Sequence, residues 1–265
     1  MNIFIREMKA HRKSLIFWCI GMIVMIASQM SKYTATSGDG QSLNTLMASM
    51  PKSIQAVIGS VSFDLSKLSG YYGMIFIYLA LIATIHAAML GADIISKEER
   101  DRTSEFLLVK PVSRSKVVTA KLSAAFVNII ILNIVTLITS IALAGKYSKG
   151  EPMTSVILNL MLGMFILQLI FMFLGTGIAA VSKNPKGASS LTMGILLATF
   201  VLYNAIGMNS HLEALKYVTP YKYFDAKNLN SSVGFEPVFM ILSVLIIVAL
   251  FTMTYVFYRK RDLEV

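Results

Sequence analysis

Charged side chains are scarce in this chain of 265 residues. Asp, Glu, Lys and Arg together make up 14% of the sequence, whereas hydrophobic residues make up 55%. This balance is too apolar for an ordinary soluble domain, so it predicts a polytopic membrane protein. The formal net charge of +10 does not require a nucleic-acid partner, because Lys and Arg are biased toward one side of membrane proteins.

Cysteine is almost absent, since Cys19 is the only one. A single cysteine excludes an intramolecular disulfide. The residues before it, Phe17 and Trp18, are not the small residues expected before a lipid-modified cysteine. The segment 25–29 is a poor signal-peptide cleavage site, so we expect the first apolar stretch to be retained.

Two chemical signatures are also missing. No G-x-x-x-x-G-K-[ST] phosphate loop occurs in the sequence, so the chain is not predicted to hydrolyse ATP itself. All 14 acidic residues fall at a predicted membrane boundary or outside it, so no carboxylate shares the hydrocarbon region with His86. We therefore predict neither a catalytic residue nor a metal site on this chain.

Long apolar stretches are what the sequence does contain. Each is close to the roughly 20 residues that cross a ~30 Å hydrocarbon core as a helix. They cover about 15–31, 71–92, 122–145, 155–181, 188–209 and 237–258. Residues 1–14 precede them as a basic amphipathic segment suited to a membrane surface. The predicted fold is an all-α membrane protein with six transmembrane helices in one domain over residues 1–265.

Basic residues set the expected orientation. Sixteen of the 24 Lys and Arg fall in segments 1–14, 93–121, 183–186 and 259–261, and eight fall in the alternate connections. This asymmetry predicts that both termini are cytoplasmic. The two longer outer connections, 32–70 and 210–236, are expected to form short helices at the membrane interface.

One connecting stretch, residues 93–121, holds five of the 14 acidic residues and seven of the 24 basic ones. So much charge cannot lie in hydrocarbon, so the stretch is a solvent-side loop. Glu98 and Arg102 are one helical turn apart, which predicts that the second span continues as a helix past the bilayer. A short apolar helix is expected at 106–109, and Ser113 is the predicted N-cap of the next helix. An apolar turn within a charged loop is suited to docking.

These residues resemble those of permease subunits of the ABC-2 type exporter family. The likeness covers Lys97–Arg100, Ser104–Leu108, Pro111–Arg114, Arg6–Gly21, Pro220–Ala226 and Tyr258–Val265. Family members often have Gly-Thr where this chain has Arg102-Thr103. The resemblance implies that residues 1–14 form an elbow helix and that the 93–121 loop holds a coupling helix seated on an ATP-hydrolysing subunit.

The resemblance also implies the function of an exporter permease in the cell membrane. The chain would pair with a second copy or a related permease, with the second and fifth spans as candidate pathway walls. It would bind no cofactor itself, because ATP and Mg would be held by the ABC ATPase subunit. The residues expected to couple to that subunit are Glu98, Glu99, Arg100, Asp101, Arg102, Glu105, Phe106, Leu107, Leu108, Val109 and Arg114.

Some polar and small residues lie inside the predicted spans. His86, Asn128, Asn133, Gln168 and Asn204 are candidates for interhelical hydrogen bonds, with lining of the transport pathway as the alternative. The second span also places small residues along one side. They are Ala80, Ala83, Thr84, Ala87, Ala88 and Gly91, and they predict close packing against another helix, within the chain or across a dimer.

Other functional classes are compatible with a polytopic membrane chain. An ATP-independent secondary transporter would more often show intramembrane carboxylates or interrupted helices. An intramembrane enzyme would need paired His, Asp or Cys inside the spans. A neighbouring gene for an ATP-binding-cassette protein would favour the exporter. The substrate class stays open among drugs, peptides, lipids and ions.

Overall fold

The computed structural model describes residues 2–36, 45, 48–51, 55, 63–65, 67–100, 113–148, 153–182, 184–230 and 234–260. In these residues the regular structure is helical, without any β-strand. Within these described ranges, six helices are long and apolar enough to cross a membrane. They are α1 (Ile3–Thr36), α4 (Leu68–Arg100), α6 (Arg114–Tyr147), α7 (Met153–Val181), α8 (Pro185–Met208) and α11 (Pro237–Lys260). The predicted all-α fold with six spans is confirmed.

The helices extend beyond the predicted spans. The predicted ranges fall inside the six helices, except that Asn209 lies one residue past the end of α8. The excess is largest in α1, which includes the basic segment as well as the first span, and it is next largest in α4 and α6, which have 33 and 34 residues. At 1.5 Å per residue each is about 50 Å long, whereas the hydrocarbon core is only about 30 Å thick. Both helices must therefore project into water or the headgroup region.

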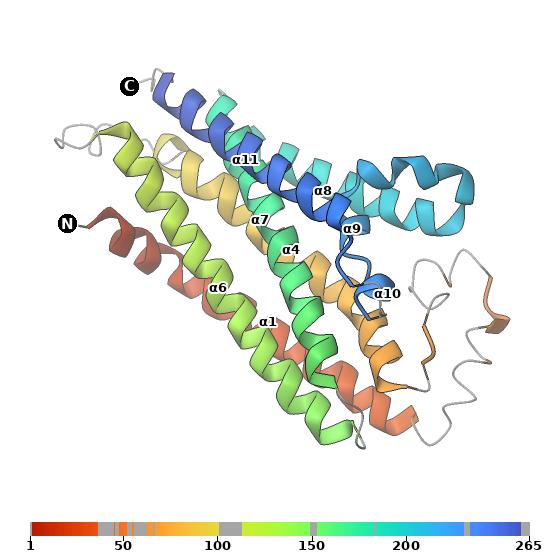
Figure 1. Cartoon of the computed structure of the whole chain (residues 1–265). Helices are drawn as coiled ribbons and strands as arrows, with labels where there is room; N and C mark the ends of the chain where they lie inside the picture. Colours follow the sequence, from red (N-terminus) through yellow and green to blue (C-terminus); the bar gives the residue numbers. More distant parts are fainter. Residues whose placement is uncertain are drawn as a thin grey trace.

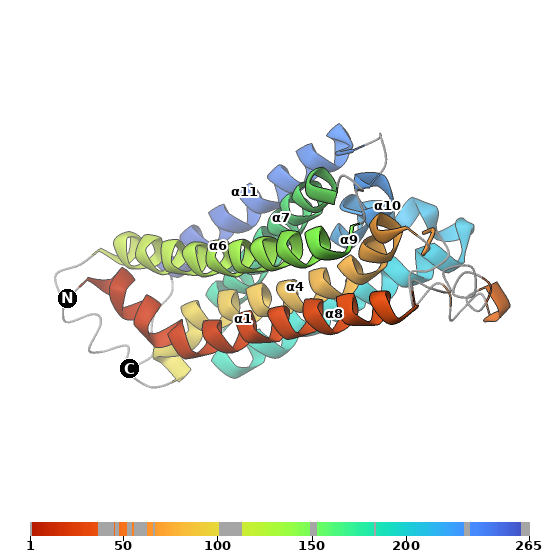
Figure 2. The same cartoon turned by 90° about the horizontal axis from the view of Figure 1, so that it is seen from below.

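The first helix includes the segment that the family resemblance identified as an elbow helix leading into the first span. Residues 3–14 are the first turns of α1, and the helix continues without interruption from Ile3 to Thr36. Figure 2 shows that these first turns are inclined relative to the rest of α1. The basic segment is therefore connected rigidly to the first span by helical backbone.

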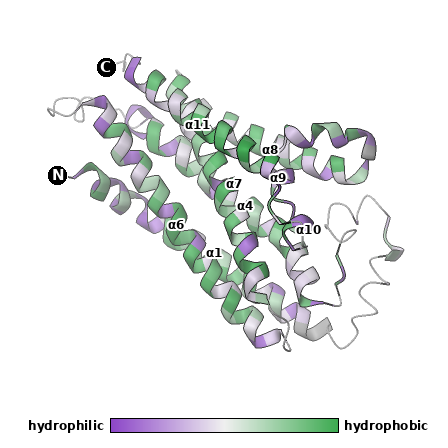
Figure 3. Cartoon of the chain, viewed as in Figure 1, coloured by the Kyte–Doolittle hydropathy of each residue, from purple (hydrophilic) through white to green (hydrophobic). Residues whose placement is uncertain are grey.

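The six helices form one bundle (Figure 1) with α4 inside it. Of the apolar window of α4, 67% is buried, against 17% for α8 and for α11. The exposed side chains of α11 are large and apolar, for example Ile241, Val244 and Leu245. Hydrophilic residues gather toward the helix ends (Figure 3). A bundle with apolar side chains on its flanks suits a lipid environment, in which lipid covers the outer helix faces.

The closest helix packing is between α4 and α7. A Cβ atom added to Gly91 would lie 2.2 Å from the carbonyl oxygen of Met172, and one added to Gly175 would lie 2.5 Å from that of Ala88. Only glycine allows the two backbones to approach this closely. The row of small residues on the second span thus packs within the chain, and α7 is its main neighbour.

Short helices cover one end of the bundle. They are η3 (Ser210–Tyr217), α9 (Pro220–Tyr223) and α10 (Ala226–Leu229). The hydroxyls of Tyr221 and Thr84 are 2.6 Å apart, which connects α9 to α4. The Asn230 side chain donates to the Ser69 carbonyl oxygen at 3.1 Å. The short helices expected in 210–236 are therefore present, whereas most of the connection 32–70 lies outside the described residues.

Candidate functional site

The end of the bundle opposite these short helices carries the stretch that the sequence singled out. There α4 ends at Arg100 and α6 begins at Arg114, and α1 begins and α11 ends at the same end (Figure 1). We call it the charged end. The side chain of Ser113 accepts a hydrogen bond from the Lys116 backbone N–H at 3.4 Å. The predicted N-cap is confirmed, and so is the helical continuation of the second span as far as Arg100.

The predicted coupling residues divide into two groups. Glu98, Glu99 and Arg100 form the last turn of α4, and Arg114 begins α6. The others lie outside the described residues, and they are Asp101, Arg102, Glu105, Phe106, Leu107, Leu108 and Val109. The structure therefore describes the two helices that hold the loop.

Three charged side chains from different helices are buried together at the charged end. Glu7 of α1 and Lys121 of α6 are both 0% exposed, and Glu98 of α4 is 7% exposed. The Lys121 ammonium donates to Glu98 Oε2 at 2.6 Å and to the Ile94 carbonyl oxygen at 2.5 Å. It also lies 4.0 Å from Glu7 Oε1. One cation thus connects α1, α4 and α6.

Two further cations surround this centre. The Arg6 guanidinium donates to Glu98 Oε1 and to Glu7 Oε1, each at 2.8 Å. Lys97 Nζ lies 3.9 Å from Glu7 Oε2. We call the five residues Arg6, Glu7, Lys97, Glu98 and Lys121 the ion cluster. The attraction between these two carboxylates and three cations compensates the free energy that each buried charge loses when it is removed from water.

Additional contacts at the charged end surround the ion cluster. Arg100 is paired with Asp93 on the same helix. The Arg114 guanidinium donates to the carbonyl oxygen of Arg259 at 3.1 Å, which connects the start of α6 to the end of α11. One turn further, the Thr119 and Tyr255 hydroxyls are 2.8 Å apart. Both ends of the 101–112 connection are therefore attached to neighbouring helices.

Few features of the sequence indicated this cluster. Lys121 was assigned to the charged loop, but it lies among apolar residues such as Val117, Val118 and Leu122. A cation inside an apolar helical face is a usable signal, because it needs an anionic partner. Glu7 is similarly the only acid in the basic segment 1–14. Their mutual proximity could not be read from the sequence, because it depends on how the helices pack.

Polar side chains within the bundle form a second set of contacts. Gln168 of α7 donates to the Ala83 carbonyl oxygen of α4 at 3.2 Å and accepts a hydrogen bond from Asn133 of α6. Asn128 donates to the Ala124 carbonyl oxygen and reaches Met8 Sδ at 3.2 Å. Asn204 donates to the carbonyl oxygen of Phe200 within its own helix. Gln168 therefore bridges three helices, whereas Asn204 bridges none of the described ones.

His86 has a different environment. Its ring lies against Trp18 of α1, with 5.5 Å between ring centroids. Its Nδ1 atom is buried, and no described residue offers it a hydrogen bond. No group of three or more His, Cys, Asp or Glu that could hold a metal ion occurs in the described parts of the chain.

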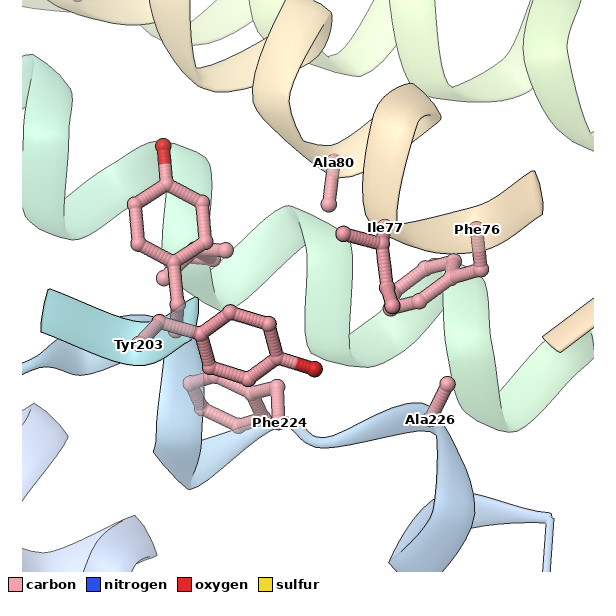
Figure 4. A pocket seen from close by; sticks show the side chains of 8 residues that line it. Phe76, Ile77, Ala80, Tyr203, Phe224 and Ala226 are labelled. Carbon is pink, nitrogen blue, oxygen red and sulfur yellow. The ribbon is translucent and has the colours of Figure 1, made fainter. Parts of the chain in front are cut away.

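A small cavity lies between α4 and α8 near the short helices. It has a volume of about 10 Å³, and Tyr203 projects across it beside Phe224, with Phe76 and Ile77 opposite (Figure 4). This volume is close to the minimum for one water molecule. The second and fifth spans, which the resemblance gave as candidate pathway walls, are α4 and α8, and they are in contact with each other in this structure.

These features define a multi-pass α-helical membrane protein, with six spans and a charged connection between two helices that project from the bilayer. The family assignment follows from comparison with known proteins. The protein-family model described as ABC-2 family transporter protein matches residues 1–263, nearly the whole chain. The chain therefore belongs to the ABC-2 transporter family and is a permease of the ABC type, a membrane component of transport. No curated protein matches it.

Proposed function

We propose that this chain is the permease subunit of an ATP-driven exporter in the cell membrane, with both termini in the cytoplasm. It forms the transport pathway as a dimer, with a second copy or a related permease. A separate ABC ATPase subunit binds ATP and Mg and docks on the connection 101–112. The observation that carries this proposal is the ion cluster, which joins both helices flanking that connection to α1.

The flanking helices are suited to transmit motion. Each is a continuous helix of about 50 Å, and α4 reaches from the charged end to the short helices at the opposite end. Lys121 of α6 is bonded to α4 at two points, Ile94 and Glu98. A displacement of the connection therefore moves α4 and α6 together, and Arg6 extends that movement to α1.

The assignment of ATP hydrolysis to a partner is supported by the lack of a phosphate-loop motif in the sequence. The cytoplasmic position of the charged end is supported by the bias of Lys and Arg toward it.

The proposal is tested by truncating two apolar side chains of the connection. Phe106→Ala with Leu107→Ala removes two side chains whose burial against a partner is worth roughly 1.5–3 kcal/mol each. We expect the variant to insert in the membrane normally but to lose co-purification with the ATPase subunit and ATP-dependent transport in vesicles. The chain purified without its partner should hydrolyse no ATP.

The matched control removes two exposed apolar side chains at the opposite end, by Leu215→Ala with Val218→Ala. This control should assemble and transport like the parent. If the Phe106/Leu107 variant does so too, the connection is not the docking element. ATP hydrolysis by the purified chain alone would contradict the division between permease and ATPase.

A further inference from the structure

The outward face of α1 carries a continuous stripe of exposed side chains, cationic in the first turns and apolar in the turns that follow. Lys9, Arg12 and Lys13 are exposed on the first turns of the helix. Ile16 and Phe17 follow on the same face, and Phe17 is 73% exposed, more than any other large apolar side chain among the described residues. Ile20 and Val24 continue the apolar part. Residues three or four positions apart share one helix face, so cations and apolar groups form one line.

The three cations of this stripe have no ionic partner in the part of the chain that the structure describes. No described residue forms an ion pair with Lys9, Arg12 or Lys13. The opposite face of the same turns holds Glu7, which is fully buried in the ion cluster. Thus these turns of α1 direct Arg6 and Glu7 into the ion cluster, whereas Lys9, Arg12 and Lys13 are exposed and form a positively charged surface.

The dimensions of the stripe match one leaflet of a bilayer. From Lys9 to Lys13 the helix rises about 6 Å along its own axis, so even with these turns inclined the three cations fit within the roughly 5–7 Å depth of one headgroup layer. From Ile16 to Val24 it rises about 12 Å, which is most of the ~15 Å of hydrocarbon in one leaflet. Figure 2 shows α1 along the side of the bundle, with the first turns inclined.

We propose that this stripe binds an anionic phospholipid, with the headgroup phosphate on Lys9, Arg12 and Lys13 and an acyl chain along Ile16, Phe17 and Ile20. Charge complementarity selects an anionic headgroup over a zwitterionic one. An acidic protein surface would match the three cations equally well. A lipid is favoured because the cations continue directly into apolar side chains that a membrane must cover.

This site needs only that the chain lies in a membrane. It does not depend on ATP, on a dimer or on the connection 101–112. If the chain does not prefer an anionic lipid here, the proposed exporter function is unaffected. If the exporter function is contradicted, the lipid site is likewise unaffected.

The chain contains its own reporter for the site. Trp18 is the only tryptophan, it follows Phe17 in α1, and its half-buried ring lies against His86 about one helical turn from the cations. Lipids brominated on the acyl chain quench tryptophan fluorescence on contact. The full chain is reconstituted in bilayers with either brominated phosphatidylglycerol or brominated phosphatidylcholine at equal mole fraction. The two quenching curves give the relative association constant of the lipids next to Trp18.

We expect phosphatidylglycerol to be preferred at low salt by tenfold or more, because each cation near an anionic surface contributes roughly a factor of five. Lys9→Gln with Arg12→Gln and Lys13→Gln should abolish the preference, so that the two lipids associate about equally. The charge-preserving variant Lys9→Arg with Arg12→Lys and Lys13→Arg should retain it. The control variant Lys67→Gln with Lys146→Gln and Lys227→Gln removes the same charge from exposed positions at the opposite end. This control should retain the preference for phosphatidylglycerol.

Several results would overturn the proposal. One is equal quenching of the parent by both lipids, and another is an unchanged preference in the Lys9/Arg12/Lys13 variant. If that variant fails to insert, the parent alone still decides, because its preference should fall steeply as salt rises. Loss of the preference in inorganic phosphate, compared with chloride of equal ionic strength, would indicate a phosphate site instead. Its loss on addition of the ATPase subunit would assign the surface to that protein.

Discussion

At the scale of single residues, the dominant feature is the burial of Glu7, Glu98 and Lys121 at one point. Each of these charges loses water on folding, and the attraction between them offsets that loss only while all remain in place. Lys121 satisfies two of its hydrogen-bonding positions with Glu98 and the Ile94 carbonyl. Removing this lysine leaves two carboxylates buried near each other, with Arg6 and Lys97 as their remaining cations.

Replacing Lys121 therefore tests how much the ion cluster stabilises the bundle. Lys121→Met should lower the free energy of unfolding by about 3–5 kcal/mol, measured by unfolding in mixed micelles with denaturing detergent. The control is Lys116→Met, an exposed lysine on the same helix, for which we expect a change within about 0.5 kcal/mol.

A double substitution tests the pairing of Lys121 with Glu98. Lys121→Met combined with Glu98→Met removes both partners, so it should recover part of the stability lost by Lys121→Met alone. Equal stability of Lys121→Met and the parent would mean that the cluster contributes nothing to the packing of α1, α4 and α6.

At the scale of elements, the position of α4 depends on its glycine contact with α7. Gly91 faces the Met172 backbone and Gly175 faces that of Ala88, so the two helices approach with no side chain between them. Gln168 adds a polar contact between the same helices through the Ala83 carbonyl. Since lipid tails are as apolar as Leu, close packing and such hydrogen bonds are what hold helices together in a membrane.

Two Gly→Ala substitutions separate packing from helix propensity. Gly91→Ala would bring a methyl group to 2.2 Å from the Met172 carbonyl oxygen, so we expect a loss of about 1–3 kcal/mol in unfolding free energy. Gly194→Ala on α8 meets nothing within 4 Å. It should be neutral or stabilising by up to about 1 kcal/mol, because alanine favours a helix.

The comparison uses the same unfolding measurement for both variants. Similar stability of Gly91→Ala and Gly194→Ala would show that α4 and α7 are not in backbone contact in the membrane.

At the scale of the whole molecule, the structure has two different ends. The ends of α1, α4, α6 and α11 that carry the ion cluster and its neighbours gather at one of them. The short helices η3, α9 and α10 gather at the other. A membrane protein with such a polarity has one orientation in the bilayer, and the distribution of Lys and Arg predicts that the charged end is cytoplasmic.

Orientation is tested with single cysteines in a Cys19→Ala background. Glu213→Cys lies in η3 with its side chain 67% exposed, and it should react with a membrane-impermeant maleimide in intact cells. Lys260→Cys lies at the exposed end of α11 and should react only after permeabilisation. The reverse labelling pattern would invert the topology, and with it the cytoplasmic assignment of the connection 101–112.

The sequence alone determined the number of spans, their helical nature and the location of the charged connection. These properties are local, because a chain in hydrocarbon must satisfy its backbone hydrogen bonds within each helix and exclude charge from it. The cap at Ser113 is local for the same reason, since it concerns a single helix end.

Only the tertiary structure decided which helix faces meet. In a membrane, core-facing and lipid-facing residues are equally apolar, so hydropathy does not tell Met22, which is buried, from Ile23, which is exposed. The pairing of Glu7 with Lys121 and of Gly91 with Met172 therefore became evident only when the helices were packed.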